Sequence, residues 1–314
     1  MQQDSIQALK NSDQLRKATP HLIAYFDILG YKAMVEKDDL DEDFTIGWLS
    51  REFATLFEYN IVNEKATCYC FSDNFVICIP YCTDSFNYDL LHLITFLEMM
   101  QGSIWKQLKM LVRGSVTFGN VFTGDKFLYG KGLVKAYELE NHMAVYPRII
   151  VDIDSLPILE SNLEETTEIW TLSKMLDCKW FLQDFDGEYF VGFPSKYLMQ
   201  YSIDLLSEFS DGYGHQLFED EECLRIIQLS NRKFVEYIID QMLILNNHPK
   251  DLEKWLWFCY QINLHINRLS DWELLKGLFF TQDDINYVFS DVLSQQVLTE
   301  RLTTLLDLFQ STLT

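Results

Sequence analysis

The stretch HLIAYFDILGYKAM at residues 21–34 places a single acidic side chain, Asp27, in an apolar run that predicts a buried strand over residues 21–28. The run breaks at Gly30. An ionised carboxylate that is buried without a partner is strongly disfavoured, because it loses its hydration and gains no compensating contact. The sequence therefore predicts that a cation, a set of hydrogen-bond donors or a basic side chain faces Asp27.

Further along the chain, helical and strand-like apolar patterns alternate. They predict, in order, a helix over 41–58, an apolar hairpin over 66–80, a helix over 85–108, a strand over 110–124, a helix over 131–142 and a strand over 146–152. The hairpin turns at Ser72, Asp73 and Asn74, so Asp73 lies at a strand end, as Asp27 does. This order favours an α+β fold in which helices pack against a mostly antiparallel sheet, with both carboxylates at one rim.

Beyond residue 155 the pattern changes. A hairpin with an Asp-Gly turn is predicted over 178–193, and long helical patterns follow from residue 219 to the end. We therefore expect a sheet domain at residues 1–155 and an extension of hairpin and helices at 156–314. No linker rich in Pro, Gly or Ser separates the two, which predicts that the extension packs on the sheet domain.

Composition limits the classes of partner. Of 314 residues, 48% are hydrophobic, which suits a packed core, and the formal net charge of −22 repels a nucleic-acid polymer. No apolar segment reaches the roughly 18–20 residues of a membrane helix, and the first residues lack the apolar core of a signal peptide. We expect a soluble, cytoplasmic protein with no membrane partner, whose seven scattered cysteines are reduced and structural.

Two carboxylates at one sheet rim suit divalent cations. Mg²⁺ prefers oxygen ligands and is commonly held by one or two carboxylates together with substrate phosphates. Next to Asp27, the stretch from Ile28 to Tyr31 opens a predicted helix, whose free amides attract phosphate. These features predict that metal ions and backbone amides together bind a small phosphate ligand.

Four sequence blocks occur in a fixed order: FDILGYK, FSDNFVI, VRGSVTFGNV, and GKGLVKAYELE followed by YPRIIV. Over roughly residues 20–155 they resemble the signature blocks of class III nucleotidyl cyclases. The version with DILG, SDN, RG and AYELE is most similar to the pyrimidine cyclases of the bacterial Pycsar antiphage defence system. The resemblance implies a class III cyclase-like (ferredoxin-like or palm) antiparallel sheet with helices, to which a mainly helical C-terminal extension is added.

The resemblance also implies roles at the rim. Asp27, Asp73 and the carbonyl of Ile28 would hold two Mn²⁺ or Mg²⁺ ions. The backbone amides that would contact a nucleoside triphosphate are those of Leu29, Gly30 and Tyr31. The implied reaction is attack of the ribose 3′ oxygen on the α-phosphorus, which gives a 3′,5′-cyclic nucleotide and pyrophosphate.

Two aromatic residues occupy the positions at which purine cyclases read the base. Where those enzymes have a lysine, four residues before the second aspartate, this chain has Tyr69. The second base-reading position falls at Phe127. Since a lysine and a carboxylate suit a purine edge, two aromatics argue against ATP and GTP, and the expected substrate is UTP or CTP, with UTP favoured.

The chain departs from the family pattern at the residues that stabilise the transition state. The usual asparagine and arginine fall at Val134 and Glu138, neither of which supplies the expected donor. Four basic residues remain as candidates for the positive charge: Arg113, Lys131, Lys135 and Arg148. Arg113 and Lys135 are the preferred catalytic candidates, and loss of activity is the remaining possibility.

The resemblance further implies a homodimer in which the aspartates of one chain face Tyr69 and Phe127 of the other. A separate effector protein would sense the cyclic nucleotide. Two alternative functions stay open: a cyclase-fold nucleotide-binding regulatory module without turnover, and a purine cyclase. Structural roles also compete for single residues, because Asp27 or Arg113 can serve in an ion pair, and Tyr69 or Phe127 in packing.

Overall fold

The computed structural model describes residues 17–32, 65–124, 127–158, 180–192, 221–245, 248–266, 280–293 and 300–312, together with helical positions 36, 47, 50, 51, 54 and 55. Its contacts divide the chain into two compact units. The sheet unit comprises Met1–Leu97, Val112–Ala144 and Ile149–Val191. The helical unit comprises Glu98–Leu111, Val145–Arg148 and Gly192–Thr314.

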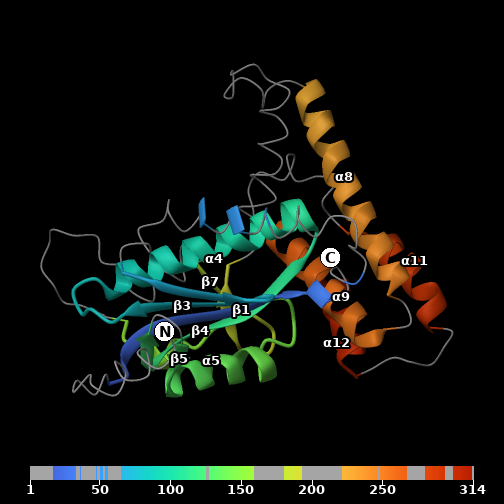
Figure 1. Cartoon of the computed structure of the whole chain (residues 1–314). Coiled ribbons are helices and arrows are strands. Elements are labelled where there is room, and N and C mark those ends of the chain that lie inside the picture. Colours follow the sequence, from blue (N-terminus) through green and yellow to red (C-terminus); the bar gives the residue numbers. More distant parts are fainter. Residues whose placement is uncertain are drawn as a thin grey trace, which may run out of the picture. The chain divides into compact units, whose positions relative to one another are not determined.

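Within the described residues, eight strands form one mixed sheet (Figure 1). They are β1 (Thr19–Leu29), β2 (Thr67–Phe71), β3 (Asn74–Pro80), β4 (Leu111–Gly124), β5 (Phe127–Tyr129), β6 (Ile149–Val151), β7 (Phe181–Gln183) and β8 (Tyr189–Val191). Their order is β2-β3-β1-β4-β6-β8-β7, with β5 paired to β4 outside this path. β4 and β6 are parallel, whereas β1–β3, β2–β3, β4–β5, β6–β8 and β7–β8 are antiparallel. The predicted α+β class with a mostly antiparallel sheet is confirmed.

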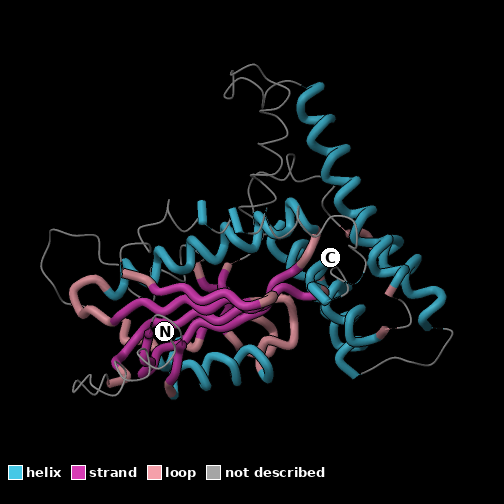
Figure 2. The backbone as a smooth tube through the Cα atoms, viewed as in Figure 1, coloured by secondary structure: helices cyan, strands magenta, loops and turns pink. Residues whose placement is uncertain are grey.

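The described helices are α4 (Phe86–Leu108), α5 (Lys131–His142), α8 (Glu221–Ile244), α9 (Pro249–Ile266), α11 (Gln282–Leu293), α12 (Glu300–Ser311) and the short 3₁₀ helix η2 (Ile153–Ser155). The first half of α4 covers one face of the sheet and α5 covers the other, with the strands between them (Figures 1 and 2).

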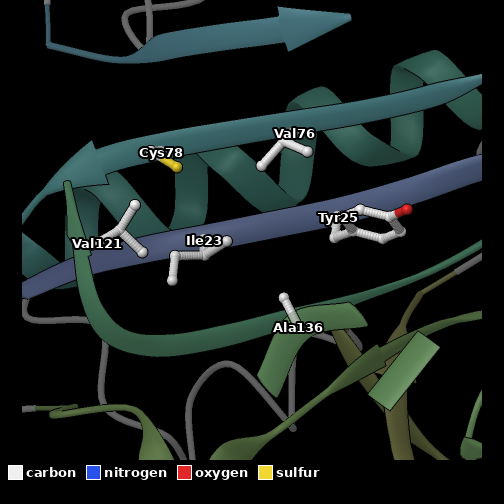
Figure 3. Packing of buried hydrophobic residues seen from close by; sticks show 6 residues of the cluster. All are labelled: Ile23, Tyr25, Val76, Cys78, Val121 and Ala136. Carbon is white, nitrogen blue, oxygen red and sulfur yellow. The ribbon is translucent and has the colours of Figure 1, made fainter. Parts of the chain in front are cut away.

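Strand β1 is buried on both of its faces. Ile23 and Tyr25 pack with Ala136 of α5 in a buried cluster (Figure 3). Phe26 points to the opposite face, where it stacks on Phe75 with 5.0 Å between ring centroids. Because side chains alternate along a strand, Asp27 shares the α5 face with Ile23 and Tyr25.

Two glycines bring α5 close to the sheet. A Cβ added at Gly119 of β4 would lie 2.8 Å from the Cα of Gly132 in α5, closer than real Cβ atoms approach. The backbones of β4 and α5 therefore touch where these glycines meet. This contact sets the distance between α5 and the sheet.

The helical unit has its own aromatic core. Trp105 lies between 5.2 and 5.9 Å, centroid to centroid, from the rings of Phe234, Phe258 and Trp255. The fully buried Asn263 bonds both the backbone N–H and the carbonyl of Phe280, each at 2.9 Å. Such satisfied polar contacts inside an apolar core fix one arrangement of the helices.

Most predicted elements recur with small shifts at their ends. The strand predicted over 146–152 is shortened to β6, because Pro147 has no N–H to donate to a ladder. Sequence periodicity did not predict β5, whereas α11 lies in the region from residue 219 onward in which helices were expected. The helix predicted over 41–58 lies mostly outside the described residues, although positions 47, 50, 51, 54 and 55 are helical.

The second predicted hairpin, β7 with β8, is confirmed and pairs with β6, so it extends the sheet. The domain boundary at residue 155 stays a prediction. In the part of the chain that the structure describes, no helix is long and apolar enough to cross a membrane.

Candidate functional site

Asp27 and Asp73 lie next to each other at one end of the sheet. β1 and β3 pair with Asp27 opposite Asn74, and the N–H of Ile28 donates to the carbonyl oxygen of Asp73 at 3.3 Å. A two-residue turn joins β2 to β3, and its first residue, Ser72, adopts a left-handed conformation at φ 57°. The structure therefore brings these two predicted residues together from distant parts of the sequence.

The basic partner that Asp27 requires is Arg113 of β4, the other neighbour of β1. Its Nε lies 3.2 Å from Oδ1 and 3.4 Å from Oδ2 of Asp27, and its Nη2 donates to Oδ2 at 3.3 Å. The geometry matches the ion-pair alternative for both residues. The two side chains are 26% and 16% exposed, so the pair is not sealed from solvent.

A second carboxylate, which the sequence did not single out, contacts the same guanidinium. Glu140 of α5 is buried, and its Oε1 lies 2.7 Å from Nε of Arg113. Burial, and then the nearby charges of Asp27 and Asp73, raise the pKa of Glu140 to about 7, although Arg113 opposes this. The signal was available in the sequence, because Glu140 follows Gly132 and Ala136 at four-residue spacing on the buried stripe of α5.

A hydrogen-bonded chain holds Asp73. Tyr25 donates its hydroxyl to Oδ1 of Asn74 at 2.6 Å, and Nδ2 of Asn74 donates to Oδ1 of Asp73 at 3.1 Å. Burial, followed by the charges of Glu140 and Asp27, raises the pKa of Tyr25 to about 12, so the phenol stays a donor. The chain fixes the orientation of Asn74 and, through it, the carboxylate of Asp73.

An open pocket of about 500 Å³ lies on the α5 face of the sheet. Its lining consists of five aromatic residues, Tyr25, Tyr69, Phe71, Phe127 and Tyr137, and four aliphatic residues, Val76, Leu128, Leu133 and Val134. The two predicted base-reading residues, Tyr69 and Phe127, thus line one pocket. The hydroxyl of Tyr69 donates to the carbonyl of Gly124 at 2.8 Å, while Phe127 is 54% exposed.

The pocket and the acidic rim share a wall. Tyr25 lines the pocket with its ring, and its hydroxyl begins the hydrogen-bonded chain that ends at Asp73. Its ring also meets that of Tyr137 edge to face, with centroids 6.0 Å apart. An apolar cavity and a pair of carboxylates therefore adjoin within one unit.

The residues predicted to contact phosphate follow Asp27 directly. Leu29 is the last residue of β1, Gly30 turns the chain at φ 86°, and Tyr31 starts a helical segment. A positive φ of this size is strained for residues with a Cβ, so a glycine suits this position. The turn places three successive backbone amides at the same end of β1 as the carboxylates.

The other basic candidates have other surroundings. Lys135 contacts Asp152, which also accepts a hydrogen bond of 2.5 Å from Thr117. Although burial opposes it, these two donors lower the pKa of Asp152. Arg148 is buried in the helical unit, with its guanidinium 5.3 Å from the ring centroid of Tyr146, and Lys131 is exposed at the start of α5. The structure joins Arg113, but not Lys135, to Asp27.

The donor chemistry of the rim fits a divalent cation that is shared with a substrate. Among the described residues, no group of three or more His, Cys, Asp or Glu side chains has the geometry of a metal site. Two carboxylates remain, Asp27 and Asp73, with Glu140 adding negative charge that Arg113 partly offsets. A site of one or two carboxylates that is completed by phosphate oxygens and water is the usual way in which Mg²⁺ is bound.

Comparison with known proteins gave similarities of structure only. No family model matches this sequence, and no curated protein matches it. The catalytic core of a rhodopsin-guanylyl cyclase with converted specificity, in complex with ATPαS, is similar at 12% identity and a TM-score of 0.36, over 56% of this chain and 96% of that one. The S helix-GGDEF-EAL part of apo LapD from Vibrio cholerae is similar at 11% identity and a TM-score of 0.26, over 94% of this chain and 81% of that one. Similarities this weak extend no property of those proteins to this chain.

Proposed function

We propose that this chain is a metal-dependent pyrimidine nucleotide cyclase, which converts UTP, or CTP, to 3′,5′-cyclic UMP or cyclic CMP and pyrophosphate. The observation that supports this most strongly is the meeting of Asp27 and Asp73 at one sheet end, beside an aromatic pocket. A cyclase needs both features, because the triphosphate requires cations and the base requires a cavity next to them.

In this proposal Asp27, Asp73 and the carbonyl of Ile28 hold two Mn²⁺ or Mg²⁺ ions. Bound there, the ions would lower the pKa of the ribose 3′ hydroxyl and neutralise charge on the departing pyrophosphate. The hydrogen bond from Asn74 orients the Asp73 carboxylate before any ion arrives. The amides of residues 29–31, in the turn that follows β1, would supply hydrogen-bond donors to the triphosphate.

Arg113 is the best-placed positive charge for the transition state. It already lies against Asp27, and a planar guanidinium binds phosphate oxygens in pairs. Lys135 would first have to leave Asp152, so its catalytic role is the weaker proposal.

The pocket supports recognition of a base by stacking. Its nine lining residues carry no formal charge, and a volume of about 500 Å³ lies in the range of small-molecule sites. The rings of Tyr69 and Phe127 would contact the base, since the Tyr69 hydroxyl is occupied by Gly124. A lining without lysine or carboxylate favours a pyrimidine over a purine, and UTP remains the favoured substrate.

A homodimer is part of the proposal, although Tyr69 and Phe127 here adjoin the carboxylates of their own chain, whereas the resemblance implied that they face those of the partner chain. Phe71, Phe127, Val134 and Tyr137 line the pocket and are each about half exposed, and Tyr129 of β5 is 74% exposed. A second copy that covers these aromatics would remove apolar surface from water and complete the cavity. The cytoplasmic location remains the expectation drawn from the apolar pattern of the sequence. The resemblance alone suggests the role in antiphage defence and a separate effector that senses the cyclic nucleotide.

One observation favours a second candidate, a nucleotide-binding module without turnover. Arg113 occupies both oxygens of Asp27, and Val134 and Glu138 stand where the family has its transition-state donors. In such a module the pocket would bind a nucleotide, while Asp27 would stay in its ion pair with Arg113 and would bind no metal ion.

The test is to incubate the purified protein with Mn²⁺ and each of UTP, CTP, ATP and GTP, and to identify the products by mass spectrometry. Cyclic UMP or cyclic CMP with stoichiometric pyrophosphate supports the proposal. Binding of a nucleotide without product supports the module, and product from ATP or GTP alone supports a purine cyclase. Light scattering on the same preparation reports whether a dimer forms.

A further inference from the structure

Arg113 faces two carboxylates with a single Nε–H. That N–H donates to Asp27, at 3.2 Å from Oδ1. Oε1 of Glu140 is closer, at 2.7 Å, yet it accepts no hydrogen bond from any described residue. The guanidinium therefore bonds one acceptor and lies in charge contact with another that is unsatisfied.

An unsatisfied acceptor of this kind is costly in a buried position. The Glu140 side chain is 4% exposed, against 16% for Asp27. Water can therefore reach Asp27 but hardly reaches Glu140, whose only described cationic neighbour is Arg113. A modest rotation of the guanidinium would turn the hydrogen bond from Asp27 to Glu140 without moving either strand.

We infer that Glu140 is a positioning residue that receives Arg113 when a divalent cation binds Asp27. A cation held by Asp27 would repel the guanidinium and compete with it for the carboxylate. Glu140 then keeps Arg113 at the rim, a short distance from the triphosphate, instead of letting it swing into solvent. The inference rests on the proposed function, because it takes Asp27 as the metal ligand.

The placement of Glu140 suits this exchange. It projects from α5, whose height is set by the backbone contact between Gly119 and Gly132. Arg113 projects from β4, and Asp27 from the neighbouring β1. The acceptor and the guanidinium thus stand on rigid elements, and only the end of one side chain has to move.

The experiment measures Mn²⁺ binding in the absence of nucleotide, by electron paramagnetic resonance, so that it does not depend on turnover. A glutamine at this position keeps an acceptor oxygen but loses the negative charge, so it binds the guanidinium more weakly, and Arg113 stays on Asp27 and competes with the cation. Glu140→Gln should therefore weaken Mn²⁺ affinity roughly tenfold, in the range seen when groups that support metal ligands are changed. In an Arg113→Gln background the same change should have an effect below about twofold, because the competitor is gone.

Glu138→Gln is the matched control, since it removes an exposed carboxylate from the same helix two residues earlier. It should leave Mn²⁺ affinity within about twofold of wild type. Two results would overturn the inference: an equal loss of affinity in Glu138→Gln, or an effect of Glu140→Gln that persists without Arg113. Either would show that the loss of negative charge alone weakens Mn²⁺ binding, with no part played by Arg113. Unchanged binding in Glu140→Gln would overturn it as well.

Two further measurements separate this inference from the proposed function. If Asp27→Asn binds Mn²⁺ as tightly as wild type, the metal site itself is wrong and the proposed function fails. If Glu140→Gln does not fold, a crystal structure of the wild-type protein with Mn²⁺ decides the point. Arg113 bonded to Glu140 supports the exchange, and Arg113 still bonded to Asp27 beside a bound ion contradicts it.

Discussion

The N–H of Ile28 donates to the carbonyl oxygen of Asp73 at 3.3 Å. This one backbone bond links the residue that follows Asp27 to the turn that precedes β3. It places two carboxylates from distant parts of the chain at one sheet end, where no side-chain contact between them is needed to hold them together. Their proximity is therefore a property of the sheet register and should survive substitution of either side chain.

Asp27→Asn and Asp73→Asn should each lower kcat/KM for Mn²⁺-UTP at least about 100-fold, because each removes an anionic ligand from a site with few protein ligands. Both positions are partly exposed, so the melting temperature should change little. Asp154→Asn, an exposed acid of the same unit, is the control and should keep wild-type activity. Near-normal turnover in either rim variant would count against the site.

Gly114→Ala should lower the free energy of unfolding by about 1–3 kcal/mol or more, because the new Cβ would lie 2.4 Å from the carbonyl oxygen of Tyr25 and 2.5 Å from Cβ of Phe26. Denaturant unfolding measures it. Gly47→Ala, at a helical position with no atom within 4 Å of the added Cβ, should be neutral or stabilising. A harmless Gly114→Ala would show that β4 does not approach β1 as described.

Tyr69→Phe should reduce the free energy of unfolding by about 1 kcal/mol, since it deletes the hydrogen bond to the carbonyl of Gly124. The ring remains, so nucleotide affinity measured by calorimetry should stay within about twofold. A large loss of affinity with unchanged stability would mean that the hydroxyl reads the nucleotide instead of anchoring β2 to the end of β4.

The pH dependence of stability should reveal Glu140. Its pKa is raised to about 7, mainly by burial, from an ordinary value of 4.5. Between these values the folded protein holds a proton that the unfolded chain has released, so this group makes the free energy of unfolding fall as the pH rises through that window. Glu140→Gln should flatten the fall, as judged by denaturant titrations at several pH values, while Glu138→Gln should not. Identical slopes for wild type and Glu140→Gln would rule out a raised pKa at this position.

The sequence predicted those features that depend on local pattern. The continuous apolar run of β1 and the polar turn at Asp73 were enough to expect strands ending at a shared rim, and the structure places both residues there. The length of α5 followed from its periodicity. The sequence predicted that a cation, hydrogen-bond donors or a basic side chain would face Asp27. It also gave Arg113 as a residue that can serve in an ion pair.

Other features depend on tertiary contacts that no local pattern carries. β5 has three residues and exists because it pairs with the end of β4, so it has no periodicity to detect. In the sequence, Lys135 and Arg113 were equally good candidates for the catalytic positive charge. Only the packing of α5 on β6 shows that Lys135 faces Asp152. The four-residue spacing of Gly132, Ala136 and Glu140 could have marked Glu140 as buried, but only the fold shows that it faces Arg113.

The most direct test of the central claim is an anomalous diffraction map of crystals soaked with Mn²⁺ and a UTP analogue that cannot be cyclised. The account predicts anomalous peaks about 2.1 Å from carboxylate oxygens of both Asp27 and Asp73, bridged to the triphosphate, with the base in the pocket that Tyr69 lines. A nucleotide bound elsewhere, or bound in that pocket with no ion at either carboxylate, would contradict it.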